Sequence, residues 1–201
     1  SRRRAMVPFA LAAFFSLSLA PGFFSFAPKH LPETASDGDW TPGLMTWYGG
    51  PSSDGSDGGA CEYRTAVSAP PFSSMVAAAN PDFYNGGMGC GACFQIKCDP
   101  SASPHCSGEN VTVTITDSCG GCSLNPPHFD LSGTAFGSLA TSGNETNLRN
   151  AGKLDMQFQR VNCNYGDTNL TFVMAPGANS YSPALTVEYV NGNGEIQGVK
   201  L

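Results

Sequence analysis

The segment Pro126–Phe136 carries a single carboxylate, Asp130, at the end of a short apolar run. Ser132 follows it, and a serine at this point is a typical N-cap for a helix of small residues. A carboxylate at the end of a strand can accept hydrogen bonds from the hydroxyl groups of a ligand. The alternative is a structural aspartate that caps the helix, and the segment alone does not decide between the two roles.

A second segment, Thr46–Gly50, has the sequence Thr-Trp-Tyr-Gly-Gly. It offers one hydroxyl and two aromatic rings, Trp47 and Tyr48, and its glycines allow a bulky ligand to approach the backbone. Aromatic rings, a hydroxyl and a carboxylate are the groups with which a protein holds a sugar chain. Together the two segments predict a carbohydrate site that contains Thr46, Trp47, Tyr48 and Asp130.

The composition and the alternation of apolar and polar residues predict the elements that carry this site. Of the 201 residues only 13 % are charged, while glycine (24) and proline (15) are abundant, which favours a loop-rich, all-β fold. Alternation predicts strands at 43–48, 93–98, 111–116 and 154–161, followed by three short strands at 170–174, 185–190 and 196–199. Short helices are predicted at 133–140 and around 72–79.

The first 27 residues have the order of a secretory signal peptide. Three arginines precede an apolar stretch that runs to Ala20, and small residues at Ser25–Ala27 predict cleavage after Ala27. The alternative is an uncleaved membrane anchor, which Pro8 and Pro21 disfavour because they interrupt a spanning helix. Residues 28–42 are then an N-terminal tail, and the protein is expected to be secreted to the extracellular region or cell wall.

The charge of the chain argues against polyanionic partners. The formal net charge is −6, and removal of residues 1–27 takes away three arginines and no acid, which leaves −9. A protein that binds a polyanion shows clustered lysine and arginine, and the remaining chain has no such cluster. Nucleic acid, acidic pectin and anionic lipid are therefore poor partners, and a neutral polymer is favoured.

Eight cysteines lie at positions 61, 90, 93, 98, 106, 119, 122 and 163. An even number in a secreted chain predicts disulfides, although the Cys-x-x-Cys spacings at 90–93 and 119–122 also resemble paired zinc ligands. The spacing alone leaves the pairing open. Three Asn-x-Thr sequons, at Asn110, Asn144 and Asn169, are candidate glycosylation sites.

Six pieces of the chain together resemble the expansin family, and the β-type and its algal or microbial relatives more than the α-type. They occur in family order at Thr46–Gly49, Gly59–Cys61, Gly89–Phe94, Thr114–Asp117, His128–Phe136 and Phe158–Cys163. No single piece carries the resemblance, which makes the combination specific.

The resemblance implies a six-stranded double-psi β-barrel over residues 43–163, followed by the truncated start of a β-sandwich carbohydrate-binding domain over 164–201. The alternative for the last segment is a β-extension of the barrel. The resemblance also implies the disulfides Cys61–Cys90, Cys93–Cys163 and Cys98–Cys106. Cys119 and Cys122 have no counterpart in that set, and we expect them to form a local fourth bridge.

Expansins are similar in fold to glycoside hydrolases of family 45, so an endoglucanase is the main alternative function. Inverting hydrolysis needs two carboxyl groups about 6.5–9.5 Å apart, one acting as acid and one as base. Asp130 matches the acid, but this chain has Gly49 and Gly50 where the hydrolases have the base. Asp54 and Asp57 lie close by, but in a Gly/Ser-rich loop, where a base would need supporting contacts to be placed precisely. We therefore expect a non-enzymatic protein.

The resemblance implies wall loosening, in which contacts between cellulose and matrix glucans are disrupted without cleavage. Asp130 is expected to anchor glucan hydroxyls, with Asp117 as a second acceptor, and Thr46 to donate a hydrogen bond. Trp47 and Tyr48 would present ring faces to the sugar. For Asp117 the alternative is an acidic turn former after a strand.

Two further residues complete the predicted polysaccharide-binding set. His128 is a possible pH-sensitive partner of Asp130, and the commoner alternative is a packed strand residue. Tyr181 resembles a surface aromatic of the second domain. The expected partner is a neutral glucan such as cellulose or xyloglucan, bound by a monomer without cofactor or metal. A further alternative is a secreted single-barrel binding or signalling protein.

Overall fold

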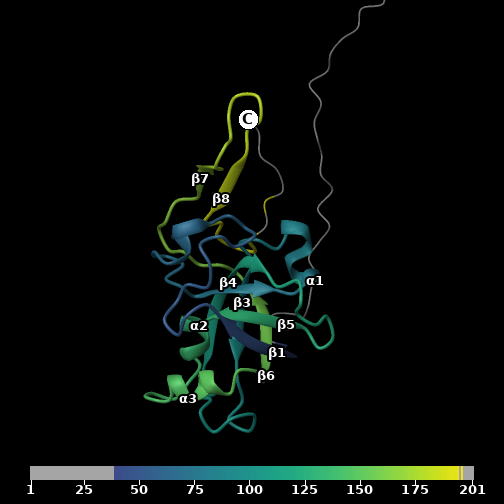
Figure 1. The fold of residues 1–201 in the computed structure, drawn as a ribbon, viewed down its shortest axis with the longest axis vertical. Helices are drawn as coiled ribbons and strands as arrows, with labels where there is room; N and C mark the ends of the chain where they lie inside the picture. Colours follow the sequence, from purple (N-terminus) through teal and green to yellow (C-terminus); the bar gives the residue numbers. More distant parts are fainter. Residues whose placement is uncertain (1–38, 195, 197–201) are drawn as a thin grey trace, which may run out of the picture.

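The computed structural model of the chain describes residues 39–194 and 196. Its main feature is a closed barrel of six strands in the order β1-β5-β2-β4-β3-β6 (Figure 1). The β1–β5 and β2–β4 pairs are parallel, and the other four pairs are antiparallel. The all-β barrel predicted from the sequence is confirmed. Its strands are β1 (Thr41–Tyr48), β2 (Val76–Ala79), β3 (Cys93–Lys97), β4 (Asn110–Ser118), β5 (His128–Ser132) and β6 (Leu154–Val161).

The N-terminal predictions mostly lie outside the described residues. These are the signal peptide over residues 1–27 and the larger part of the tail over 28–42. Thr41 and Pro42, which the sequence analysis assigned to the tail, belong to β1, where they pair with Phe158 and Gln157 of β6. No helix in the described part of the chain has the length and hydrophobicity needed to span a bilayer.

The barrel core is built from aromatic residues of several elements. Phe83, Phe94, Phe129 and Phe158 are buried, and their ring centroids lie 5.0–6.2 Å apart. Such aromatic pairs add to the stabilisation that burial of apolar area already gives. Phe83 belongs to α1 (Pro81–Tyr84), whose N-cap Asn80 accepts a hydrogen bond from the Phe83 amide.

Strand β2 corrects the prediction of a helix around 72–79. Its sequence Val-Ala-Ala-Ala favours a helix by local propensity, yet all four residues are buried between β4 and β5. Tertiary packing overrides propensity here, because small side chains allow neighbouring elements to cover both faces of the strand.

The helix predicted at 133–140 is shorter in the structure, and a second helix follows it. α2 (Gly133–Gly137) begins as expected at Ser132, whose Oγ accepts a hydrogen bond of 2.9 Å from the Ala135 amide. α3 (Glu145–Asn150), which the sequence analysis did not predict, packs beside α2. Two 3₁₀ turns, η1 (Arg64–Val67) and η2 (Asn85–Gly87), complete the helical elements of the described residues.

Four disulfides involve all eight cysteines, so neither Cys-x-x-Cys pair is free to bind zinc. The pairs are those implied by the family resemblance together with the expected fourth bridge: Cys61–Cys90, Cys93–Cys163, Cys98–Cys106 and Cys119–Cys122.

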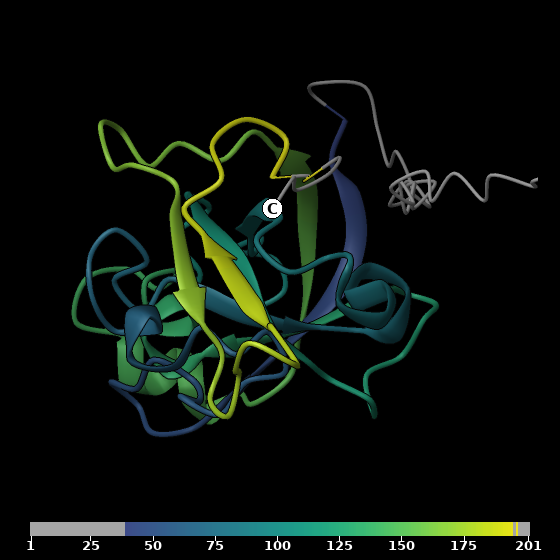
Figure 2. The same ribbon diagram turned by 90° about the horizontal axis from the view of Figure 1, so that it is seen from above.

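A second, two-stranded sheet follows the barrel. It consists of β7 (Thr171–Met174) and β8 (Leu185–Glu188), which pair antiparallel. The two strands stand beyond one end of the barrel in Figure 1 and overlie it in Figure 2. The third predicted strand, 196–199, lies outside the described residues apart from Ile196.

Aromatic contacts hold this sheet to the barrel. Phe72, Tyr165 and Tyr189 form a cluster in which each ring contacts the other two, at centroid separations of 5.0–5.9 Å. The Tyr165 hydroxyl lies 3.0 Å from Thr114 Oγ1 of β4. The side chain of Arg64 donates a hydrogen bond to the Met174 carbonyl of β7.

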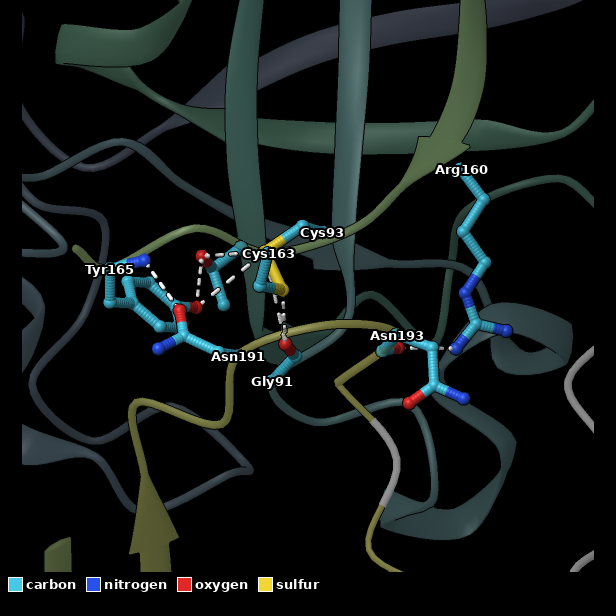
Figure 3. The surroundings of a disulfide bond; sticks show 8 residues. Gly91, Cys93, Arg160, Cys163, Tyr165, Asn191 and Asn193 are labelled. Atoms are coloured by element: carbon cyan, nitrogen blue, oxygen red, sulfur yellow. Dashed lines mark hydrogen bonds between the residues drawn. A yellow bond between two sulfur atoms is a disulfide. The ribbon is translucent and has the colours of Figure 1, made fainter. Parts of the chain in front are cut away.

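The chain after β8 returns to the barrel beside the Cys93–Cys163 bridge (Figure 3). Cys163 and Gly192 exchange two backbone hydrogen bonds of 2.6 and 3.0 Å. The side chain of Asn191 accepts a hydrogen bond from the backbone amide of Tyr165 at 2.7 Å. The disulfide therefore lies where the end of the barrel, the linker and the segment after β8 meet.

Candidate functional site

Four residues form one row across four neighbouring strands. Thr46 of β1 is opposite Asp130 of β5, and Asp130 is opposite Ala78 of β2, which is in turn opposite Asp117 of β4. Residues directly opposite each other in a regular ladder point to the same face. The β2–β4 register shifts between Ala77 and Ala78, so Asp117 joins the set next to a bulge, and its charge acts on Asp130. We call this set the cross-strand row. Neighbouring strands are about 4.8 Å apart, so the Cα atoms of Asp117 and Asp130 are about 10 Å apart.

A hydrogen-bond chain fixes Asp130 within the row. The Thr46 hydroxyl donates to Asp130 Oδ1 at 2.5 Å, and the same hydroxyl oxygen lies 2.9 Å from His128 Nε2. Because the single hydroxyl proton is used toward Asp130, the oxygen accepts from an N–H at Nε2. The chain therefore runs from His128 through Thr46 to Asp130, and it brings together three residues that the sequence predicted.

The surroundings of this chain shift the pKa values of both ionisable groups. Burial raises the pKa of the Asp130 carboxyl, an effect opposed by the Thr46 hydrogen bond and by His128 and increased by the charge of Asp117. Burial lowers the pKa of His128. The charge of Asp130 raises it in opposition, and the charge of Lys153 lowers it further. Both shifts favour the neutral forms of the two groups.

Asp117 at the end of β4 anchors the loop that follows β1. Its Oδ1 accepts hydrogen bonds of 2.7 Å from the amides of both Ala60 and Ser118. Gly59 of the loop lies so close to β4 that a Cβ at this position would be 2.7 Å from the Thr116 carbonyl oxygen. At its other end the loop is fixed to α2, because the Thr134 hydroxyl donates to the Ser53 carbonyl at 2.9 Å.

Tyr48 lies near both carboxylates, beneath this loop. Burial raises the pKa of its hydroxyl above the ordinary value, and the charges of Asp117 and Asp130 raise it further, with a smaller effect from Asp54. The hydroxyl oxygen is buried, and no partner in the described chain meets hydrogen-bond geometry with it, although Asp117 is near. Gly55 covers this end of the ring: a Cβ on Gly55 would lie 2.6 Å from the hydroxyl oxygen.

Trp47 and Tyr48 are adjacent in β1, so their side chains point to opposite faces of the strand. Its side chain packs against the barrel core, and its indole N–H donates to the Arg149 carbonyl of α3 at 2.9 Å. The expected ring face for sugar contact is thus not on the face that carries Thr46 and Tyr48. Tyr181 is also apart from the row: it is 98 % exposed in the loop between β7 and β8.

Ala78 is the member of the row that sequence reasoning missed. Its only signal was the run of alanines at 77–79, which also fits a helix. Because its side chain ends at Cβ, it leaves the space between Asp117 and Asp130 to other groups, and the position is only 3 % exposed.

The remaining predicted sites are distributed over the surface. Asn110 and Asn169 are exposed, whereas the Asn144 side chain donates to Thr141 Oγ1 and accepts from Asn147. Within residues 39–194 and 196, no group of three or more metal-ligating side chains is brought together.

Comparison with known proteins places this geometry in a family. A family model described as lytic transglycolase matches residues 76–158. The chain is 49 % identical over 179 residues to putative expansin-B2 of Arabidopsis thaliana, covering 88 % of this chain and 65 % of that protein. It is 44 % identical over 195 residues to expansin-B4 of the same plant, covering 96 % and 72 %. Expansin-B11 of Oryza sativa subsp. japonica is 45 % identical over 172 residues, covering 85 % and 58 %.

Solved structures agree with the fold. The apo expansin of Clavibacter michiganensis matches with a TM-score of 0.53 and 25 % identity, covering 74 % of this chain and 63 % of that one. A mutant of that expansin in complex with cellohexaose matches with a TM-score of 0.55 and 23 % identity, with the same coverage. The barrel is thus of the double-psi type. This chain spans 65 % and 58 % of the lengths of expansin-B2 and expansin-B11. With relatives of this identity and coverage, the chain belongs to the expansins and is β-expansin-like.

Proposed function

We propose that this chain is part of a secreted, non-hydrolytic wall-loosening protein that binds a neutral glucan at the cross-strand row. The observation that carries the proposal is the row itself, in which Asp130 and Asp117 flank a short side chain. Tyr48, half-buried near the two acids, would offer the part of its ring that the loop does not cover. Carboxylates accept hydrogen bonds from sugar hydroxyls, and an aromatic ring provides contact area for the C–H face of a sugar.

The electrostatics of the chain favour a neutral ligand. The net charge is −6, and the acceptors in the row are acids, so a polyuronide would be repelled. Cellohexaose, the ligand in one expansin structure of the same fold, is a neutral glucan and is therefore the first ligand to test. A monomer with a barrel over 43–163 and the beginning of a β-sandwich over 164–201 completes the proposal.

The contacts of Asp117 support a function without hydrolysis. Its Oδ1 already accepts two backbone N–H groups that hold the loop after β1. A general base needs an oxygen directed at the attacking water, and positioned general catalysis contributes about 10²–10⁴-fold in rate. With Oδ1 held by two amides, only Oδ2 of Asp117 can meet a water or accept from a sugar hydroxyl, which restricts this carboxylate as a base.

The test is creep of heat-inactivated wall strips under constant load, with the released reducing sugar measured in parallel. The whole protein that carries this chain should cause creep without releasing reducing sugar, and Asp130→Asn should abolish creep. Asp167→Asn is a matched control, because it removes the same charge from an exposed turn outside the barrel. Absence of creep with the intact protein would refute the proposal.

An endoglucanase is the second candidate, and one observation favours it. The Cα separation of about 10 Å between Asp117 and Asp130 is compatible with carboxyl groups at the spacing of an inverting pair. Release of reducing ends from soluble glucan, lost in Asp130→Asn and kept in Asp167→Asn, would establish this candidate in place of the first.

A further inference from the structure

A polar cavity of about 320 Å³ lies between the loop after β1 and the helices α2 and α3. This volume is within the range of small-ligand sites, about 300–1,000 Å³. Its chemistry comes from Ser52 of the loop, Ser138 at the C-cap of α2, and Glu145 and Arg149 of α3, with Pro51 as an apolar wall. None of the residues that line the cavity is a member of the cross-strand row, although Arg149 holds the Trp47 indole and Thr134 holds the loop after β1.

The guanidinium group of Arg149 is held in a fixed position. Its Nε donates to the Gly133 carbonyl at 2.9 Å, and its backbone carbonyl accepts the Trp47 indole N–H. Gly137 makes room for it: a Cβ there would lie 1.9 Å from an Arg149 terminal nitrogen. Within the described residues, Nε is the one side-chain nitrogen of Arg149 with a hydrogen-bond acceptor. The terminal nitrogens therefore keep donors for a ligand.

Glu145 lies one helical turn before Arg149, a spacing at which opposite charges often pair. Both side chains line the cavity, but no ion pair joins them in the part of the chain that the structure describes. Oε1 of Glu145 accepts a hydrogen bond of 3.1 Å from the Gly143 amide, so Oε2 is the oxygen left for a ligand. A carboxylate and a guanidinium that remain apart offer acceptors and donors to the same ligand. Sugar hydroxyls need both, since each hydroxyl can donate and accept.

The cavity is close to the cross-strand row. Pro51 follows Tyr48 by three residues, so their Cα atoms are at most about 11 Å apart, and Thr134 follows Asp130 by four residues, at most about 14 Å. We propose that this cavity binds one neutral sugar residue of the glycan held at the row, with Glu145 accepting from vicinal hydroxyls and Arg149 donating to them. This inference rests on the proposed function, because it adds a subsite to the same ligand.

The sugar can come from the main chain of a linear glucan or from a branch of a matrix glycan. Cellohexaose and an arabinose-substituted xylohexaose represent the two sources. Binding of each is measured by calorimetry and by the NMR signal of the Trp47 indole N–H, which is hydrogen-bonded to α3 and reports on ligand in the cavity. Glu145→Gln and Arg149→Lys should each weaken binding about tenfold, because each removes or alters a hydrogen bond to a charged group.

The outcomes separate this inference from the proposed function. Weaker binding of cellohexaose by the two α3 variants assigns the cavity to the main chain of a glucan. Weaker binding of the branched ligand alone assigns it to a branch, and either result supports the inference. Binding that is lost in Asp130→Asn but unchanged in both α3 variants, with no shift of the Trp47 signal, overturns the cavity alone. Binding that depends on Glu145 but not on Asp130 overturns the row as a site. No binding of either ligand overturns both, and Asp167→Asn controls for loss of one charge.

Discussion

Removal of the Thr46 hydroxyl should raise the pKa of Asp130. In the folded protein this hydroxyl donates to Asp130 Oδ1 at 2.5 Å and lowers a pKa that burial raises. Thr46→Val keeps the shape of the side chain and removes only the donor. A hydrogen bond to a charged group is worth about 1.5–3 kcal/mol. The bond stabilises the protonated carboxyl less than the carboxylate. Its removal should therefore change the free-energy difference between the two forms by about 1.4 kcal/mol, which raises the pKa of Asp130 by about one unit.

The assay is an NMR pH titration of the Asp130 side-chain carboxyl carbon in the wild type, Thr46→Val and Thr46→Ser. Thr46→Ser keeps the hydroxyl and should titrate like the wild type. Thr46→Val should titrate at higher pH, and binding of cellohexaose, if it requires the ionised acid, should weaken over the same range. The variant also leaves the His128 N–H without its acceptor, which should cost about 1 kcal/mol of unfolding free energy. An unchanged or lower pKa of Asp130 in Thr46→Val would refute the hydrogen-bond chain.

Three further predictions concern stability, each measured by denaturant unfolding. Because burial raises the pKa of Asp130 above its unfolded value, its contribution is present at low pH and is lost as pH rises. The stability of Asp130→Asn relative to wild type should therefore increase from pH 4 to 7, and a decrease would contradict the shift. Gly55→Ala should lose about 1–2 kcal/mol, since φ is +83° and its Cβ would meet Tyr48. Gly58→Ala should lose little, because its Cβ would make only an ordinary contact of 3.6 Å with Ser56 Oγ. Replacing Cys119 and Cys122 by serine should cost about 2 kcal/mol, against about 4 for the bridge with a sequence separation of 70, and equal losses would contradict the loop-closure argument.

Sequence patterns predicted the strands well where alternation is strong, as in β4 and β6. Local patterns failed at β2, because burial between two strands overrides the helix propensity of an alanine run. They also missed α3, a helix of six residues that depends on contact with α2 and on the Trp47 indole. Short elements of this kind are set by tertiary contacts, which no window of sequence contains.

In the candidate site, too, local sequence patterns predicted some features and tertiary contacts set the others. Thr46, His128 and Asp130 were predicted as members of one site, and the parallel pairing of β1 and β5 is what brings them together. Trp47 was predicted with Tyr48 because the two residues are adjacent in sequence. In a strand, adjacent side chains point to opposite faces, so the period of two separates them. The row with Ala78 and Asp117 depends on strand order, which only the folded barrel provides.

Asp117 is the residue on which the distinction between binding and hydrolysis depends. Asp117→Asn retains Oδ1 as an acceptor for the Ala60 and Ser118 amides, so the loop should stay in place while the charge is lost. If Asp117 only accepts a sugar hydroxyl, the variant should bind cellohexaose several-fold more weakly and still cause some wall creep. If it were a general base, any release of reducing sugar by the wild type should fall by about 10²–10⁴-fold while binding persists. Asp117→Ala, which removes the anchor as well, should in addition destabilise the loop, because two backbone donors lose their acceptor. A difference between the two variants in unfolding free energy therefore measures the structural role, and the Asn variant measures the chemical one.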